Sequence, residues 1–249
     1  MLAIWYRVGP KRNNYLGCKI PVGAGIIIVL PVILSNFIIF PTKMVYIFAG
    51  SSIFLGLIGF VDDLWGNSKI KGFKGHFKAL VNGKITSGML KVVAGSIASL
   101  LAAIVISQGY ANLIINFIVI ALSVNALNLF DLRPGRCLKI FFFLTSIIWL
   151  GTQFYGKYQE ALYLFTVVSA GIIFFIYDLK ALAMLGDAGS NILGFTIGFT
   201  FAIIFPLYIK VIFTLLLVLL HWYTEKISLT ELIRENEILN YLDNLGRLK

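Results

Sequence analysis

Adjacent carboxylates at Asp62 and Asp63, in the string GFVDDLWG, are the first residues of this sequence that could carry chemistry. Two neighbouring carboxylates repel each other unless a cation lies between them, which makes the pair suited to binding magnesium. Another carboxylate, Asp187, stands in the string LGDAGS at the expected start of a helix. There it could hold a metal-bound phosphate together with free backbone amides. The alternatives are structural: Asp–Asp can mark a helix end, and Asp187 can be an N-cap.

Two amides and a carboxylate recur at three-residue spacing in the string NALNLFD. On a helix, Asn125, Asn128 and Asp131 would therefore lie on one face. Amides inside a membrane are costly unless they are paired, so hydrogen bonding between helices is the alternative to a binding site. The grouping with a carboxylate favours a site, and we include the following Arg133 and Arg136 as candidate substrate contacts.

A basic stretch, KIKGFKGHFK at residues 69–78, follows the carboxylate pair. Lysines interleaved with glycines allow ammonium groups and backbone amides to approach phosphate oxygens closely. His76 could act as a general base, but a lone histidine at an interface is more often a polar contact. The stretch therefore predicts phosphate binding near Asp62 and Asp63.

The elements that position these residues are expected to be membrane helices. Of the 249 residues, 59% are hydrophobic and 13% are charged, and the mean hydropathy is +0.91. A soluble domain carries about twice that share of charged residues, so the soluble class is excluded. Long apolar runs without period-2 alternation favour helices over a barrel. We predict an all-α polytopic bundle of about eight spans, at residues 20–40, 44–61, 89–107, 111–130, 138–152, 160–177, 188–205 and 207–222.

The basic residues are distributed unevenly between the two sets of loops that these spans define. All but three of the 21 Lys and Arg residues fall in one set, the exceptions being Lys43, Lys157 and Lys210. Because basic residues favour the cytoplasmic side, we expect both termini and all the segments above to face the cytoplasm, in the plasma membrane. All acids except Glu160 fall on the same side. Acids follow that rule only weakly, so a chemical site on this face is a second explanation.

The charge and the tail add two expectations. The net charge of +10 suits contact with anionic membrane lipids and a phosphate-bearing substrate, and we expect no nucleic-acid partner. Residues 223–249 follow the transmembrane domain at 1–222, and there Ser228 and Glu231 match a capping box and Gly246 can end a helix. We predict an amphipathic cytoplasmic helix on the membrane surface or over the site. The alternative is that it only docks on the bundle.

Four strings in a fixed order carry a resemblance to a known family: IPVGAG (20–25), GFVDD (59–63), NALNLFD (125–131) and LGDAGS (185–190). The chain resembles, from about residue 14 to 205, the polyprenyl-phosphate N-acetylhexosamine-1-phosphate transferases of glycosyltransferase family 4. This family includes the enzyme that makes the first lipid intermediate of peptidoglycan. The chain is similar to a divergent and shortened member.

The resemblance implies a magnesium-dependent reaction of bacterial cell-envelope glycan biosynthesis. A sugar 1-phosphate would pass from a UDP-sugar to undecaprenyl phosphate, and UMP would be released. Asp187 resembles the family's magnesium ligand, and Asp62 and Asp63 resemble a pair near the metal and the prenyl phosphate. The implied catalytic residues are Asp62, Asp63, Asp131 and Asp187, and the implied substrate contacts are Lys19, Lys78, Asn125, Asn128, Arg133, Arg136, Gly189 and Ser190.

The chain also departs from the family's pattern. We expect it to lack the family's first and last spans. It has Leu132 and Pro134 where the family has Gly and a second Asp, and its only histidines are His76 and His221. A non-catalytic relative that binds nucleotide or polyprenyl lipid is therefore an alternative. A lipid transporter is another, although transporters usually place ionisable residues at mid-membrane. The four aspartates favour an enzyme, and a homodimer is compatible with the sequence.

Overall fold

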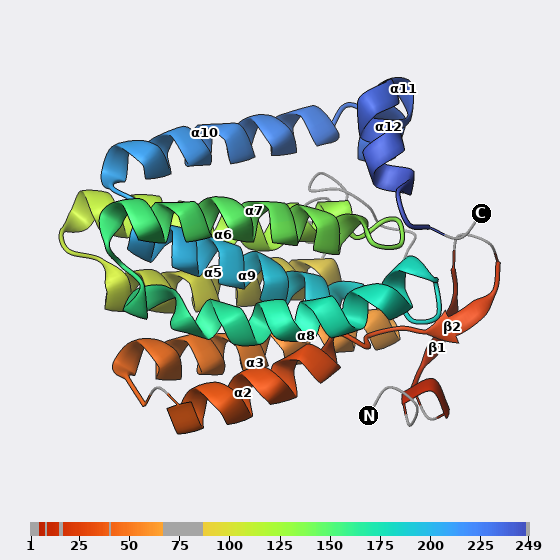
Figure 1. The fold of residues 1–249 in the computed structure, drawn as a ribbon, viewed down its shortest axis with the longest axis horizontal. Coiled ribbons are helices and arrows are strands. Elements are labelled where there is room, and N and C mark those ends of the chain that lie inside the picture. The colour runs from red at the N-terminus through yellow and green to blue at the C-terminus, as the bar shows by residue number, and fades with distance from the viewer. Residues whose placement is uncertain (1–4, 8, 15–16, 40, 67–86, 248–249) are drawn as a thin grey trace, which may run out of the picture.

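The computed structural model describes residues 5–7, 9–14, 17–39, 41–66 and 87–247, which form a bundle of long helices (Figure 1). The predicted all-α class is confirmed, with one small addition: an antiparallel hairpin that pairs Arg12 with Ile20. The elements are β1 (Lys11–Asn13), β2 (Lys19–Pro21), α2 (Ile26–Ile39), α3 (Lys43–Trp65), α5 (Ser87–Ile106), α6 (Tyr110–Phe130), α7 (Arg136–Tyr155), η1 (Gln159–Ala161), α8 (Leu162–Leu179), α9 (Gly186–Ile204), α10 (Leu207–Thr224), α11 (Leu229–Glu235) and α12 (Glu237–Asn244).

Among the described residues, seven helices are long and apolar enough to cross a membrane: α3, α5, α6, α7, α8, α9 and α10. The remaining predicted span, residues 20–40, contains the shorter helix α2 of 14 residues. At a rise of about 1.5 Å per residue, α2 reaches about 21 Å, short of a hydrocarbon core of about 30 Å. Part of the predicted span instead forms β2 and a turn at Gly23, whose φ is +68°.

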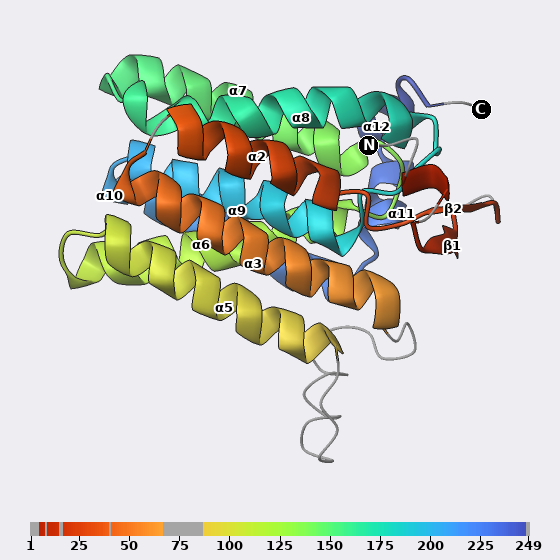
Figure 2. The same ribbon diagram turned by 90° about the horizontal axis from the view of Figure 1, so that it is seen from below.

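Helix α9 is the centre of the bundle, as both views show (Figures 1 and 2). Of its most apolar 18-residue window, 89% is buried inside the protein, against 44% or less for the other spans. Glycines let neighbouring helices approach it closely: a Cβ at Gly194 would lie 2.5 Å from the carbonyl oxygen of Ser123 on α6. Small residues have this role in membrane helix packing, so α9 is positioned by protein contacts on all sides.

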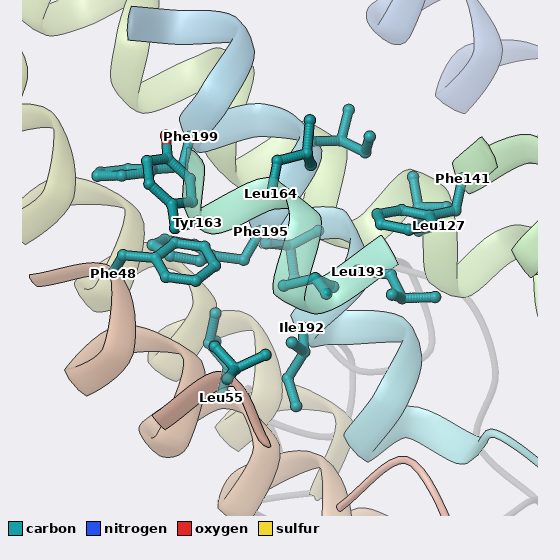
Figure 3. Packing of buried hydrophobic residues seen from close by; sticks show 14 of the residues in the cluster. Phe48, Leu55, Leu127, Phe141, Tyr163, Leu164, Ile192, Leu193, Phe195 and Phe199 are labelled. Atoms are coloured by element: carbon teal, nitrogen blue, oxygen red, sulfur yellow. The ribbon is translucent and has the colours of Figure 1, made fainter. Parts of the chain in front are cut away.

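Aromatic rings fix α9 against its neighbours in the half of the bundle far from its N-terminus (Figure 3). Phe195 and Phe199 stack with their centroids 5.4 Å apart. Phe48 from α3 lies 5.7 Å from Phe199, and Tyr163 from α8 lies 4.6 Å from Phe48. Such pairs stabilise packing beyond the area they bury, so α3, α8 and α9 form one rigid unit.

The C-terminal tail contains two short helices rather than one continuous helix. It breaks at Asn236, whose side chain accepts a hydrogen bond of 3.0 Å from the Leu239 amide and so begins α12. Ser228 precedes α11 but makes no side-chain cap bond, so the predicted capping box is wrong. Gly246 follows α12 with φ +77°, as expected for a helix end. Both helices lie at the same end of the bundle as the hairpin (Figure 1).

Candidate functional site

A cavity of about 360 Å³ opens at the end of the bundle where α9 begins. Its walls come from the hairpin, the end of α3, the loop after α6, the end of α8 and the start of α9. Five carboxylates and two guanidinium groups contribute to the lining, which makes the cavity acidic. They are Asp62, Asp63, Asp131, Asp178, Asp187, Arg12 and Arg133.

Close backbone contact between α3 and α9 brings Asp62, Asp63 and Asp187 together. A Cβ at Gly59 would lie 2.5 Å from the carbonyl oxygen of Asp187. Gly186 has φ +71°, and a Cβ there would lie 2.5 Å from the Asp63 carboxylate. Only glycine allows both approaches without displacing the backbone. The glycines of GFVDD and LGDAGS therefore set the distance between the two strings.

Asp63 caps the N-terminus of α9. Its Oδ1 accepts a hydrogen bond of 2.9 Å from the Asp187 amide, and its Oδ2 accepts one of 3.1 Å from the Ala188 amide. The first amides of a helix have no partners within the helix, and a carboxylate there also stabilises the helix dipole. Both oxygens of Asp63, which is buried, are thus engaged with backbone. Asp63 orients Asp187 directly.

Asp187 faces a second carboxylate and a lysine. Its Oδ2 lies 2.9 Å from the ammonium nitrogen of Lys91 on α5, and the pair is partly exposed. The side chains of Asp62 and Asp187 lie within hydrogen-bonding reach of each other. Two carboxylates at such a distance are stable only with a proton or a cation between or beside them. Lys91 supplies one such charge, and sequence reasoning did not select it because it lies a turn inside a span.

The residues present fit a magnesium ion that arrives with a phosphate ligand. In the described part of the chain, no three Asp, Glu, His or Cys side chains are placed to hold a metal ion by themselves. Magnesium is usually bound by one or two carboxylates, several waters and substrate phosphates, so a complete protein cage is not required. Asp62 and Asp187 provide two such carboxylates beside an open cavity.

Asp131 and Asp178 also line the cavity. Desolvation raises the pKa of Asp131 well above its usual value, and the charges of Asp178, Asp187 and Asp63 raise it further. Asp178 is buried, and its Oδ2 accepts a hydrogen bond of 2.8 Å from the Gly135 amide. Sequence reasoning placed Asp178 on the same side as the other acids but did not select it. Its position at the end of a span was the signal.

The four uncharged residues among the predicted substrate contacts, Asn125, Asn128, Gly189 and Ser190, lie outside the cavity lining. Ser190 donates a hydrogen bond of 2.9 Å to the side-chain oxygen of Asn128, which is the helix–helix pairing considered above as an alternative. Asn125 is exposed on α6. Gly189 packs directly against Gly25 of the turn before α2. Ser190, Asn128 and Gly189 therefore hold α9 in place in this structure.

The predicted basic contacts are divided. Arg133 lines the cavity. Arg136 is buried and bonds to Asp243 of α12, with 2.7 Å between Nη2 and Oδ2. Lys19 is exposed on β2 outside the lining, and Lys78 lies outside the described residues. Arg12, Asn13 and Asn14 of the hairpin line the cavity and were not selected.

The family comparison covers the whole carboxylate cluster. The model described as "Glycosyl transferase family 4" matches residues 44–206, from the start of α3 to the residue before α10. No curated protein matches the chain. The matched part is well over half of the 249 residues and includes the five aspartates of the cavity. The chain therefore belongs to glycosyl transferase family 4, as a membrane protein with a helical bundle.

Proposed function

We propose that this protein transfers a sugar 1-phosphate from a UDP-sugar to a polyprenyl phosphate, with magnesium, at the cytoplasmic membrane face. A phosphate oxygen of the acceptor lipid would attack the β-phosphorus of the UDP-sugar. The bond from that phosphorus to the bridging oxygen would break, and UMP would leave. The observation that carries the proposal is the meeting of Asp62 and Asp187 in the lining of an open cavity, with Lys91 paired to Asp187 behind it.

The cavity suits a diphosphate in size, and in charge when the diphosphate carries magnesium. Its volume of about 360 Å³ is within the range of about 300–1,000 Å³ for small-molecule sites. Asp62 and Asp187 would hold the magnesium ion, which neutralises charge on the diphosphate when bound. Lys91 would place a second positive charge beside the reacting phosphate, where preorganised charges stabilise the transition state. An acceptor phosphate is already ionised at neutral pH, so no base is needed.

A second, apolar cavity supports a lipid acceptor. It has a volume of about 210 Å³ and is lined by apolar side chains of α6, α7, α9 and α10 and by one polar side chain, Ser123. Phe130 lines this cavity, and its neighbour Asp131 lines the acidic one, so the two lie on either side of the end of α6. A prenyl chain in the apolar cavity would have its phosphate near the aspartates.

The charges at the far end of α9 support the cytoplasmic placement. Lys157 and Lys210, two of the three basic residues predicted to lie on the external side, contact the carbonyls of Ile203 and Ala202 near the C-terminus of α9. The acidic cavity lies at the N-terminus of the same helix. The positive-inside rule then favours the cytoplasm as the side on which the cavity lies.

One observation favours the non-catalytic alternative. The ion pair of Lys91 with Asp187 already supplies a cation to the carboxylate that would bind magnesium. A protein that only binds nucleotide or lipid would need no metal there.

An activity assay separates the two functions. The full chain, purified in detergent, is mixed with magnesium, undecaprenyl phosphate and a panel of UDP-sugars, and UMP release is measured. We expect release that requires magnesium and the lipid with at least one sugar. Nucleotide binding without UMP release across the panel would support the non-catalytic protein and contradict the transferase.

A further inference from the structure

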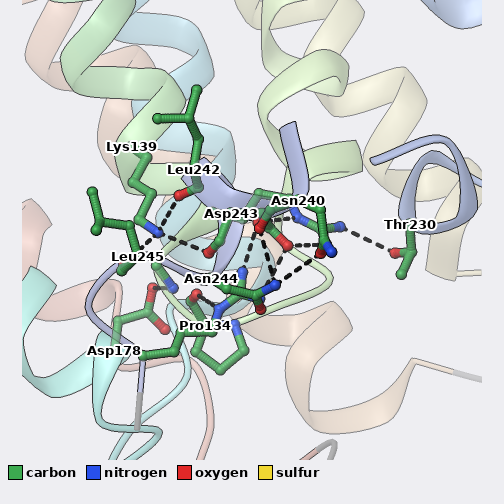
Figure 4. Close-up of polar contacts among 12 residues, drawn as sticks. Pro134, Lys139, Asp178, Thr230, Asn240, Leu242, Asp243, Asn244 and Leu245 are labelled. Atoms are coloured by element: carbon green, nitrogen blue, oxygen red, sulfur yellow. Dashed lines mark hydrogen bonds and ion pairs between the residues drawn. The ribbon is translucent and has the colours of Figure 1, made fainter. Parts of the chain in front are cut away.

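One tail carboxylate, Asp243 of α12, binds two guanidinium groups (Figure 4). Arg136 donates a hydrogen bond to each of its two oxygens, at 2.8 and 2.7 Å. Arg247 does the same at 2.7 and 3.0 Å. The side chains of Asp243 and Arg136 are only 8% and 4% exposed. Buried contacts in which a guanidinium group donates two hydrogen bonds to one carboxylate fix the relative position of the two side chains, because a shift of either one weakens both bonds.

Lys139 attaches the end of α12 to α7. Its ammonium nitrogen donates hydrogen bonds to the carbonyl oxygens of Leu242, Asp243 and Leu245, at 2.9, 2.8 and 2.7 Å. The last carbonyls of a helix have no partners within the helix, and a cation there stabilises them. The tail is therefore docked on α7 by a side chain that also provides hydrogen-bond partners for the last carbonyls of α12.

The tail also reaches the wall of the acidic cavity. The Nε of Arg247 donates a hydrogen bond of 2.7 Å to the carbonyl oxygen of Pro134, a lining residue. From the cavity side, Asp178 accepts a hydrogen bond of 2.8 Å from the Gly135 amide. The wall at residues 131–135 thus lies between two sets of contacts, one from inside the site and one from the tail.

Backbone hydrogen bonds of the adjoining helices hold the two ends of this wall: the Asp131 amide donates to the Asn128 carbonyl at 3.1 Å, and the Gly135 carbonyl accepts from the Lys139 amide at 3.0 Å. Residues 131–135 form turns and a bend between α6 and α7, and Gly135 has φ +74°. A segment without helix or strand bonding depends on side-chain contacts for its position. Arg247, through the Pro134 carbonyl, and Asp178, through the Gly135 amide, supply such contacts.

We propose that the tail is a brace for the substrate cavity, in which Asp243 and Arg247 are positioning residues that hold the 131–135 wall. We call the Asp243–Arg136, Asp243–Arg247 and Arg247–Pro134 contacts the tail brace. That the ligand of this wall is a nucleotide sugar rests on the proposed function. The brace itself rests on the contacts alone.

The brace should act on binding more than on chemistry. If the wall is in place for only a fraction of the time, the apparent affinity falls by that fraction. Asp62 and Asp187 come from α3 and α9, outside residues 131–135, and the contact of Asp187 with Lys91 does not involve the tail. Loosening the brace therefore raises KM and leaves kcat nearly unchanged.

The test compares Arg247→Gln with the matched control Arg234→Gln, an exposed arginine of α11. Each variant of the full chain is assayed for UMP release and for hydrogen exchange at residues 131–136. For Arg247→Gln we expect KM for the nucleotide sugar to rise about tenfold with kcat within about twofold, the scale of one lost charged hydrogen bond. We also expect faster exchange at the Gly135 amide. The control should change neither.

The two readouts separate this inference from the proposed reaction. Faster Gly135 exchange in Arg247→Gln but not in the control supports the brace even if the wild-type protein releases no UMP. Unchanged exchange and unchanged KM in an active Arg247→Gln protein overturn it. Asp243→Glu, which keeps the charge, should restore most of the exchange protection that Asp243→Asn loses. If Asp243→Asn fails to fold, the Arg247→Gln result decides.

Discussion

Two aspartates at the same end of this bundle, Asp131 and Asp243, have opposite environments. In the acidic cavity, burial and neighbouring carboxylates raise the pKa of Asp131 well above its usual value. In the tail, burial also acts to raise the pKa of Asp243, but hydrogen bonds from Arg136 and Arg247 outweigh it and the pKa is lowered. Asp243 has two cations of its own, whereas the cavity holds more carboxylates than cations. The cavity is therefore the place that gains from an added cation, and the tail is not.

The largest effect is expected at Asp187, where an amide would remove the charge that holds magnesium. We predict that Asp187→Asn lowers UMP release at saturating magnesium by at least about 100-fold, because several kcal/mol of transition-state stabilisation are lost. Thermal stability in detergent should stay near the wild-type value. His221→Ala is the control, since that ring contacts the Leu217 carbonyl and lies outside the cavity lining.

Near-full activity of Asp187→Asn would place the chemistry on other residues. A His221→Ala protein as inactive as we expect Asp187→Asn to be would do the same.

At Arg136, which contacts the tail, we expect a loss of stability and no change in magnesium binding, the reverse of the Asp187 result. Removing one partner of a buried ion pair costs about 3–5 kcal/mol, because the remaining charge stays buried. We predict that Arg136→Gln destabilises the docked tail, seen as faster proteolysis after α10, while magnesium binding by the protein is unchanged. Wild-type resistance to proteolysis would show that the tail does not depend on this pair. Loss of magnesium binding would show that the two regions are not separate.

Sequence patterns were sufficient for the class and for the meeting of four aspartates. Asp62, Asp63, Asp131 and Asp187 each stand at or near the end of an apolar run, and the charge pattern placed those ends on one side. Helices that cross a layer in alternating directions then bring them to one end. This reasoning requires only the positions of the apolar runs, which hydropathy gives, and the side of the membrane on which their ends lie, which the charge pattern gives.

The individual contacts could not be predicted in the same way. Asp63 caps a helix 124 positions away, and Arg136 bonds to a residue 107 positions away. Both depend on which helices pack together, and an apolar pattern does not encode that choice. The shortened α2 has a similar cause, since hydropathy cannot distinguish a buried strand such as β2 from the start of a span.

A smaller effect is expected at Lys91, which shares Asp187 with any incoming metal. We predict that Lys91→Gln binds magnesium a few-fold more tightly, because Asp187 no longer has a competing cation. UMP release should nevertheless fall, because the positive charge beside the phosphate is lost. Titration of the full chain with magnesium, with Lys180→Gln as a charge-matched control outside the lining, measures the first effect. Weaker magnesium binding would mean that Lys91 supports the metal site and does not compete with it.

The smallest effect is expected from pH in the tail. The pKa of Asp243 in the folded protein lies below its usual value, because hydrogen bonds from Arg136 and Arg247 outweigh burial. Its ion pairs therefore add stability that is fully present above the unfolded pKa and is lost as pH falls through the folded pKa. We predict that at about pH 5 the tail of Asp243→Asn is cleaved by pepsin faster than the wild-type tail, and that this difference narrows towards about pH 3. The reason is that a protonated aspartic acid, like asparagine, carries no charge to bind Arg136 and Arg247. A difference that stays constant over this range would mean that Asp243 contributes through shape, and the contrast with Asp131 would then not be one of charge.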